Sequence, residues 1–244
     1  MKTSHLAAVS AALTTICALM PARSLATSSP SVPVGTLTAV PTVVQTGTKP
    51  TLTWTINYPS VVANYITITP PATLTPTQNL LCDIRMLGLG VTSQGSNGSI
   101  TYYRTRGQWK YNNSSTWADI YDGSQTDTIV QQQGLVKTGI SINTSKPLYF
   151  AGQYYNSGWS TLYTSTDGIG NVKTLVNGDT PPPYLPAYNA PSLETFLKPY
   201  LDSTGKVSIG PMDVIIFMEL THTNQSDPGY DFQDLVMLLT FRTP

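Results

Sequence analysis

The chain has 244 residues, with 13 basic and 13 acidic side chains, so its formal net charge is zero. Charged residues make up 11% of the sequence, against about 25% in an ordinary soluble domain, and 36 Thr and 22 Ser residues supply polarity instead. This composition excludes a nucleic-acid-binding protein that works through a basic face, because counterion release requires clustered Lys and Arg. It also excludes a charge-rich disordered tail.

The first 26 residues have the pattern of a secretory signal peptide. Lys2 supplies a positive charge, residues 6–20 are apolar apart from Ser and Thr, and Ser24-Leu25-Ala26 places small residues where signal peptidase recognises them. The alternative, a core helix or a membrane anchor, is weaker because the apolar stretch is too short and hydroxyl-rich to span comfortably. We therefore expect cleavage after Ala26 and a secreted, periplasmic or cell-surface location, with no membrane span in the mature chain.

Cleavage at this site changes the charge and the cysteine count. Loss of Lys2 and Arg23 leaves 11 basic and 13 acidic residues, a net charge of −2, and Cys82 becomes the single cysteine. No intramolecular disulfide can then form, so stability must come from a core. A chain of this size buries about 70% of its surface on folding, which is sufficient. Cys82 lies in an apolar run and is expected to be buried.

Short segments that alternate apolar with hydroxyl-bearing or aromatic residues follow one another after the leader, separated by turn residues. The predicted strands are residues 50–58, 65–69, 83–87, 99–104, 116–121, 126–130, 137–142, 147–155, 159–164 and 171–176. The dipeptide Asp122-Gly123 favours a hairpin. Strands at this spacing predict an all-β fold, an immunoglobulin- or fibronectin-like β-sandwich over residues 32–180.

A proline-rich segment and one short helix follow the predicted sandwich. Pro181 to Pro183 cannot join a central ladder, so residues 181–192 are expected to form a stiff linker. Ser192 can cap a helix that Pro199 limits to about two turns. The apolar positions of this helix share one face: Leu193, Phe196 and Leu197.

Two apolar segments, residues 212–220 and 235–241, are predicted to pair as antiparallel strands. The first is apolar almost throughout, which is typical of a strand buried on both faces. Residues 193–244, the helix plus this C-terminal hairpin, are too few to hold a core alone. We expect them to pack on the sandwich.

The most acidic stretch of the chain joins these two strands. Hard oxygen ligands from a short loop suit calcium, which takes 6–8 of them. In the alternative, no ion is bound and the Asp side chains accept hydrogen bonds from backbone amides and brace the turn. The candidate ligands are Glu219, Asp227, Asp231 and Asp234.

The segment Asp231-Phe-Gln-Asp-Leu-Val236, with Glu219 on the preceding strand, resembles a known signature. The signature is Asp-Tyr/Phe-Asn-Asp-Leu-Val, from a domain of unknown function near the C-termini of many bacterial secreted and surface proteins. The resemblance covers about residues 205–244. It implies that Glu219, Asp231 and Asp234 hold a metal ion or build the domain, and it assigns no activity. Gln233 stands where the signature has Asn, and Asp227 has no counterpart.

Aromatic residues crowd the segments 109–121 and 149–163. An exposed row of rings would stack on sugars; the alternative is that the rings fill the core and form cross-strand pairs. Because neighbours on a strand point to opposite faces, one of Tyr154 and Tyr155 should face solvent or a partner. The candidates for carbohydrate stacking are Trp109, Tyr111, Trp117, Tyr154 and Trp159.

Motifs for catalysis are scarce. A Ser-His-Asp triad would depend on His222, and the sequence has no Gly-x-Ser-x-Gly elbow and no Gly-rich phosphate loop. The leading hypothesis is a secreted or cell-envelope, non-catalytic structural or adhesive module, stabilised by calcium, whose partner is a polysaccharide or a cell-surface protein. The second is a carbohydrate-binding module. The third is a hydrolase that uses an Asp pair.

Overall fold

The computed structural model describes residues 34–40, 51–57, 60–183 and 190–244. The predicted signal peptide, residues 1–26, lies outside the described residues. So does the middle of the predicted linker 181–192.

One large sheet has five strands, all paired antiparallel. In spatial order they are β10 (Leu135–Ile142), β5 (Leu80–Gly88), β15 (Leu235–Arg242), β14 (Asp213–Met218) and β13 (Val172–Val176). The predicted antiparallel pairing of the two C-terminal strands is confirmed, with Phe217 opposite Val236. This hairpin lies inside the sheet, between β5 and β13, so it is an integral part of the sandwich.

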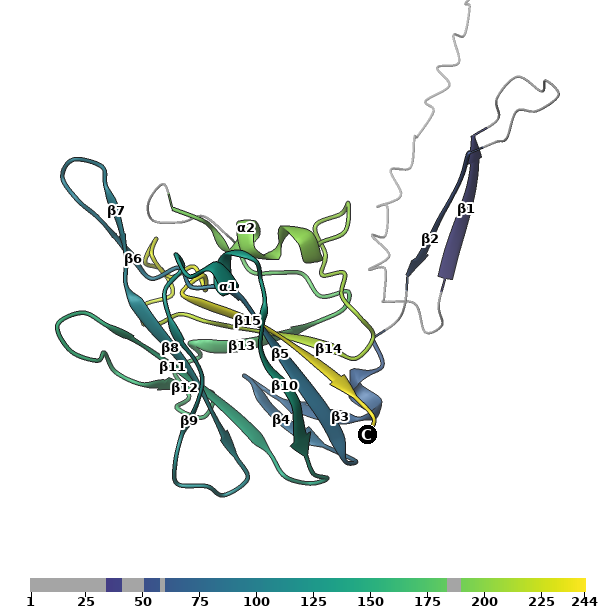
Figure 1. The fold of residues 1–244 in the computed structure, drawn as a ribbon, viewed down its shortest axis with the longest axis horizontal. Coiled ribbons are helices and arrows are strands. Elements are labelled where there is room, and N and C mark those ends of the chain that lie inside the picture. Colours follow the sequence, from purple (N-terminus) through teal and green to yellow (C-terminus); the bar gives the residue numbers. More distant parts are fainter. Residues whose placement is uncertain (1–33, 41–50, 58–59, 184–189) are drawn as a thin grey trace, which may run out of the picture.

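The second large sheet has six strands and faces the first (Figure 1). Its strands are β3 (Ile66–Thr69), β4 (Thr73–Pro76), β11 (Leu148–Tyr155), β8 (Arg104–Tyr111) and β9 (Ala118–Gly123) in spatial order, with β12 (Tyr163–Thr164) paired to β11. The fold is therefore mostly β, with two antiparallel sheets packed against each other, as expected for a β-sandwich.

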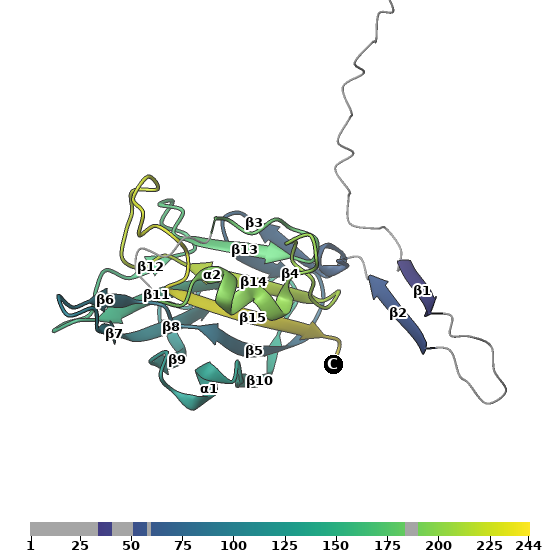
Figure 2. The ribbon, with the colours of Figure 1, turned by 90° about the horizontal axis from the view of Figure 1, so that it is seen from above.

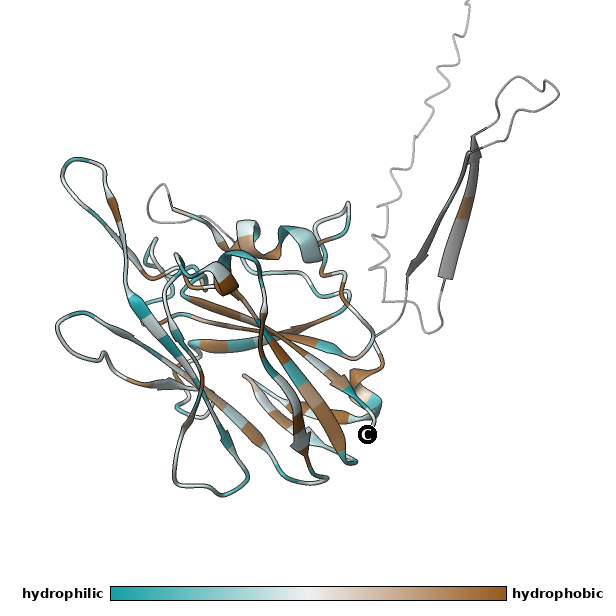
Figure 3. Ribbon diagram, viewed as in Figure 1, coloured by the Kyte–Doolittle hydropathy of each residue, from teal (hydrophilic) through white to brown (hydrophobic). Residues whose placement is uncertain are grey.

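Alternation along the strands builds the interior core. On β5, Leu80, Cys82, Ile84 and Met86 are buried, while the residues between them are half-exposed. The thiol of Cys82 is 2% exposed, as expected, and burial raises its pKa. Figure 3 shows apolar residues concentrated on the five-stranded sheet and hydrophilic residues along much of β8.

A second core covers the outer face of the five-stranded sheet. The helix α2 (Leu193–Leu197) buries Leu193, Phe196 and Leu197 against that face, and Ser192 caps it by accepting a hydrogen bond from the backbone N–H of Thr195. Figure 2 shows α2 lying over β14 and β15. Strand β14 is consequently buried on both faces, as its apolar sequence predicted. Each fully buried large apolar side chain contributes about 1.5–3 kcal/mol.

Two local predictions were wrong. The predicted strand 126–130 is the helix α1 (Thr128–Gln131), and Asp122-Gly123 ends β9 without forming a hairpin turn. The reason is Asp127, whose carboxylate accepts hydrogen bonds from the backbone N–H of Ser124 at 3.0 Å and from the hydroxyl of Tyr121 at 2.7 Å. These bonds close a turn that leads into the helix.

The predicted strand 159–164 is strand only at Tyr163 and Thr164. Before them, the Ser160 hydroxyl accepts a hydrogen bond from the backbone N–H of Tyr154 at 3.0 Å, which replaces a ladder bond. The remaining elements are two small antiparallel pairs and two 3₁₀ turns: β1 (Val34–Val40) with β2 (Thr51–Asn57), β6 (Thr92–Gln94) with β7 (Ile100–Tyr102), η1 (Val62–Asn64) and η2 (Lys198–Tyr200). Across the described ranges, no helix has the length and apolarity needed to cross a membrane.

Candidate functional site

The outer face of the six-stranded sheet carries polar and aromatic side chains. Along β8, alternation sends Thr105 and Gly107 toward the interior, and these residues are buried. Arg104, Arg106 and Lys110 occupy the outward positions. We call this outer surface of β8, β9 and β11, together with the adjoining loop residues Trp117 and Trp159, the β8 face.

One cluster of the β8 face surrounds Trp159. The guanidinium carbons of Arg106 and Arg104 lie 4.0 Å and 5.3 Å from the Trp159 ring centroid, and the Tyr155 ring packs edge-on at 5.4 Å. Both arginines also donate to the carboxylate of Asp122. Nη2 of Arg104 is 2.8 Å from Asp122 Oδ2, and Nη2 of Arg106 is 2.7 Å from the same oxygen. Burial alone would raise the pKa of Asp122, but these charge-assisted bonds outweigh it and hold the pKa below its ordinary value.

A second cluster lies farther along β8. The Lys110 ammonium is 4.8 Å from the Trp117 ring centroid and 5.2 Å from that of Tyr149, close enough for cation–π attraction to both rings. Among the described residues, Lys110 forms no ion pair. Between the clusters, the Gln108 amide donates to Asp119 at 2.8 Å.

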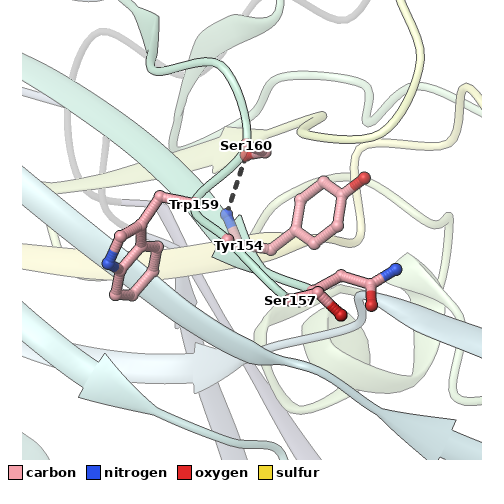
Figure 4. Close-up of a pocket in the computed structure, with 6 residues that line it drawn as sticks. Tyr154, Ser157, Trp159 and Ser160 are labelled. Atoms are coloured by element: carbon pink, nitrogen blue, oxygen red, sulfur yellow. Dashed lines mark hydrogen bonds between the residues drawn. The ribbon is translucent and has the colours of Figure 1, made fainter.

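A hollow of about 260 Å³ opens beside Trp159 (Figure 4). Figure 4 shows the rings of Trp159 and Tyr154 pointing to opposite sides of the chain, with the Ser160 hydroxyl bonded to the Tyr154 amide. The hollow is slightly smaller than the roughly 300–1,000 Å³ usual for small-molecule sites. Its lining combines rings with hydroxyl and amide groups: Tyr154, Asn156, Ser157, Gly158, Trp159 and Ser160.

The five predicted stacking residues do not form one row. Trp109, Tyr111 and Tyr154 pack against the interior core, which leaves Trp117 and Trp159 on the β8 face. Tyr155 is 42% exposed, as expected for one member of its pair. The sequence pattern did not identify Arg104, Arg106, Lys110 and Tyr149 as residues of this face. Basic residues at alternate positions of a strand, in so charge-poor a chain, were the signal that would have found them.

The predicted acidic site is built around Glu219, which is fully buried at the end of β14. Its Oε1 accepts from the backbone N–H and hydroxyl of Thr221, at 2.9 Å and 2.7 Å, and from the backbone N–H of His222 at 2.9 Å. Its Oε2 accepts from the backbone N–H groups of Asp231 and Phe232, at 3.0 Å and 3.3 Å. One carboxylate thus fastens both ends of the loop between β14 and β15.

Asp234, 4% exposed, is hydrogen-bonded to Glu219 and accepts from the backbone N–H of Leu220 at 2.6 Å. Burial, followed by the neighbouring charge and the hydrogen bond of Glu219, raises the pKa of Asp234 well above its ordinary value. Burial beside Glu219 therefore favours the protonated form of Asp234. Asp231 is also buried and accepts from the backbone N–H of Gln233 at 3.2 Å.

Asp227 lies apart from this pair, toward the loop surface. Its Oδ1 accepts from the backbone N–H of Gly229 at 2.9 Å and is 3.5 Å from Nε2 of His222, whose Nδ1 is 3.6 Å from Glu219 Oε1. The imidazole thus connects the outer and inner parts of the loop.

The fit of the four acidic residues to calcium is limited by these bonds. The Glu219 oxygens already accept from five protein donors, and in the described part of the chain no three acidic, His or Cys side chains are grouped to hold a metal ion. Gln233, whose buried Oε1 lacks a hydrogen-bond partner, lines a cavity of about 30 Å³ together with Asp231 and Asp234. That space holds one water-sized species. The alternative set out above, in which Asp side chains accept from backbone amides, describes Asp227, Asp231 and Asp234, and Glu219 accepts from backbone amides as well.

A larger hollow of about 320 Å³ lies on the other side of this loop. Asp227 and Asp231 are in its wall, with Lys173, Tyr230 and Phe232. The Lys173 ammonium is 4.5 Å from the Phe232 ring centroid. This hollow is the location that a hydrolase with an Asp pair would use.

Comparison of the chain with protein-family models, curated proteins and solved structures gave no match. The resemblance of Asp231–Val236 to the bacterial signature therefore stays a prediction.

Proposed function

We propose that this chain is a non-catalytic adhesive module of the cell exterior that contacts its partner through the β8 face. The observation that carries the proposal is the pair of cation–aromatic clusters on this face, one around Trp159 and one around Trp117. Trp, Tyr and Arg are the residues most enriched at the energetic centres of binding surfaces. The outer face of the other sheet is occupied by the second core.

The location and the finer fold assignment belong to the same proposal. The signal pattern of residues 1–26 supports export, and the likeness of Asp231–Val236 to bacterial secreted proteins supports the cell exterior. The exclusively antiparallel pairing of both large sheets supports an immunoglobulin- or fibronectin-like sandwich. Calcium stabilisation of the C-terminal loop remains a separate prediction.

Retention on insoluble surfaces tests the proposal. The purified chain is applied to cellulose, chitin and cross-linked pectate, and to albumin-coated beads as a protein surface. The double variant Trp117→Ala/Trp159→Ala is expected to lose retention at least tenfold, since Trp residues dominate such contacts. The matched control is Leu135→Ala, which removes a 40% exposed side chain from β10 on the other sheet.

Two outcomes would count against the proposal. If the wild-type chain is retained on none of these surfaces, the adhesive function is wrong. If the double variant is retained as well as the wild type, the β8 face is wrong. Hydrolase activity that disappears in Asp227→Asn would instead favour the hollow beside the C-terminal loop.

A further inference from the structure

The β8 face concentrates charge in a chain that is otherwise poor in it. Three of the 13 basic residues of the sequence, Arg104, Arg106 and Lys110, lie within seven positions on one side of β8. Two carboxylates, Asp119 and Asp122, face them. Three cations against two anions leave a local charge of +1. The surface is therefore complementary to an anionic partner but far too weakly charged for nucleic acid.

Arg104 and Lys110 remain available to a ligand, whereas Arg106 is 23% exposed and pairs with both Asp119 and Asp122. Asp122 is shared between two arginines, and the side chain of Arg104 is still 56% exposed. Lys110 contacts the rings of Trp117 and Tyr149 and has no carboxylate partner among the described residues. An anionic group that approaches either position meets a cation already desolvated on one side by an aromatic ring.

The spacing of the two clusters indicates an extended ligand. Arg106 and Lys110 are four residues apart on the same side of a strand, which corresponds to about 13–14 Å. A single small anion cannot reach both cations, whereas a polymer with repeated anionic groups can. The amide of Asn156 and the hydroxyl of Ser157 beside Trp159 are suited to sugar hydroxyls.

We propose that the partner of the β8 face is an anionic polysaccharide that lies along β8, with its acidic groups at Arg104/Arg106 and at Lys110 and its sugar rings against Trp159 and Trp117. This inference rests on the adhesive function proposed above and adds the chemical class of the ligand. The acidic groups are carboxylates or sulfates, which present the same charge to a guanidinium or an ammonium.

Affinity electrophoresis of the full chain tests this inference with soluble polymers in the gel. Polygalacturonate supplies the carboxylate polymer, dextran sulfate the sulfated one, dextran the neutral sugar and polyglutamate the acidic polymer without sugar rings. We expect retardation by one or both acidic polysaccharides, and we expect it to weaken between 50 and 500 mM salt, because exposed ion pairs are screened.

The variant Lys110→Gln is expected to weaken retardation about fivefold, the upper range for an exposed ion pair. The control Lys198→Gln removes an equal charge from the covered side of the other sheet and should change retardation less than twofold. Arg106→Gln is the second test variant, with its melting temperature checked because it also loses the contact with Asp122.

If dextran retards the chain as much as the acidic polysaccharides do, and Lys110→Gln has no effect, the anionic class of the ligand is wrong. A loss of dextran binding in the Trp variants would then still support the proposed adhesive function. Equal retardation by polyglutamate would overturn the sugar. If no polymer retards the chain, but albumin beads retain it in a Trp-dependent way, the β8 face binds a protein partner. That result would overturn this inference and leave the proposed adhesive function standing.

Discussion

Gly107 on β8 and Gly152 on β11 lie directly opposite each other, and both face the interior of the sandwich. A Cβ at Gly107 would lie 2.9 Å from Cδ1 of Leu235, and one at Gly152 would lie 2.8 Å from Cδ2 of Leu220. The absence of side chains at this glycine pair is what lets the C-terminal strands of the other sheet approach β8 and β11 closely.

Gly152→Ala is therefore expected to lower the free energy of unfolding by about 1–3 kcal/mol, the usual cost of overpacking a core. The control is Gly158→Ala, where an added Cβ meets nothing within 4 Å, and it should change stability by less than about 0.5 kcal/mol. Urea denaturation followed by tryptophan fluorescence measures both. Equal stability of the two variants would mean that the sheets have room to move apart.

The two glutamates of the chain make a matched pair for a second prediction. Glu219→Gln replaces a carboxylate that accepts from five donors with an amide that presents one oxygen and an N–H₂ group. We expect a loss of about 2–4 kcal/mol, since buried donors lose their acceptor. Glu194→Gln, exposed on α2, should stay within about 0.5 kcal/mol of the wild type. A small effect at Glu219 would show that the loop is held by other contacts.

From the raised pKa of Asp234 we predict an unusual dependence of the free energy of unfolding on pH. Its folded pKa is raised, so between the unfolded pKa of about 3.9 and the folded pKa the folded state binds a proton that the unfolded state has released. Its contribution to stability therefore grows as the pH falls from the folded pKa toward about 4, by at most about 1.4 kcal/mol per pH unit.

Asp234→Asn mimics the protonated acid and should remove this dependence. We expect the variant to gain on the wild type at pH 7 and to lose that advantage at pH 4.5, in unfolding curves measured with a chelator present. Parallel stability curves for the two proteins between these pH values would contradict the raised pKa of Asp234.

Calcium stabilisation is tested by the melting temperature with and without chelator. The prediction requires a gain of about 2.7 kcal/mol at a calcium concentration 100 times the dissociation constant. An unchanged melting temperature at saturating calcium would leave the loop held by its hydrogen bonds within the protein, those of Glu219 among them. The variant Glu219→Gln should then respond to calcium no differently from the wild type.

Local patterns predicted the strands and the single longer helix well, because alternation and capping act over a few residues. Ser192 and the apolar residues of α2 behave as their spacing indicated. The strand expected at 126–130 failed because Asp127 closes a turn by side-chain bonds that hydrophobic pattern does not reveal.

Features that depend on contacts between segments far apart in the chain could not be predicted from the sequence pattern. Trp109 and Trp117 look equivalent in the sequence, but the register of β8 sends Trp109 toward the core while Trp117 meets Lys110 outside. The glycine pair on β8 and β11 depends on a cross-strand register and on the approach of a distant strand. For the acidic loop, the residues were predicted but the raised pKa of Asp234 was not, since it follows from its burial beside Glu219.

The place of β15 between β14 and β5 sets the order in which the protein can assemble. Leu239 of β15 pairs with Ile84 of β5, far earlier in the chain. The five-stranded sheet thus cannot close until residues 235–242 have left the ribosome, and such non-local pairing forms slowly. Until then β5 lacks one of its two neighbours in the sheet, and the edge that β15 later covers is open to pairing with other strands.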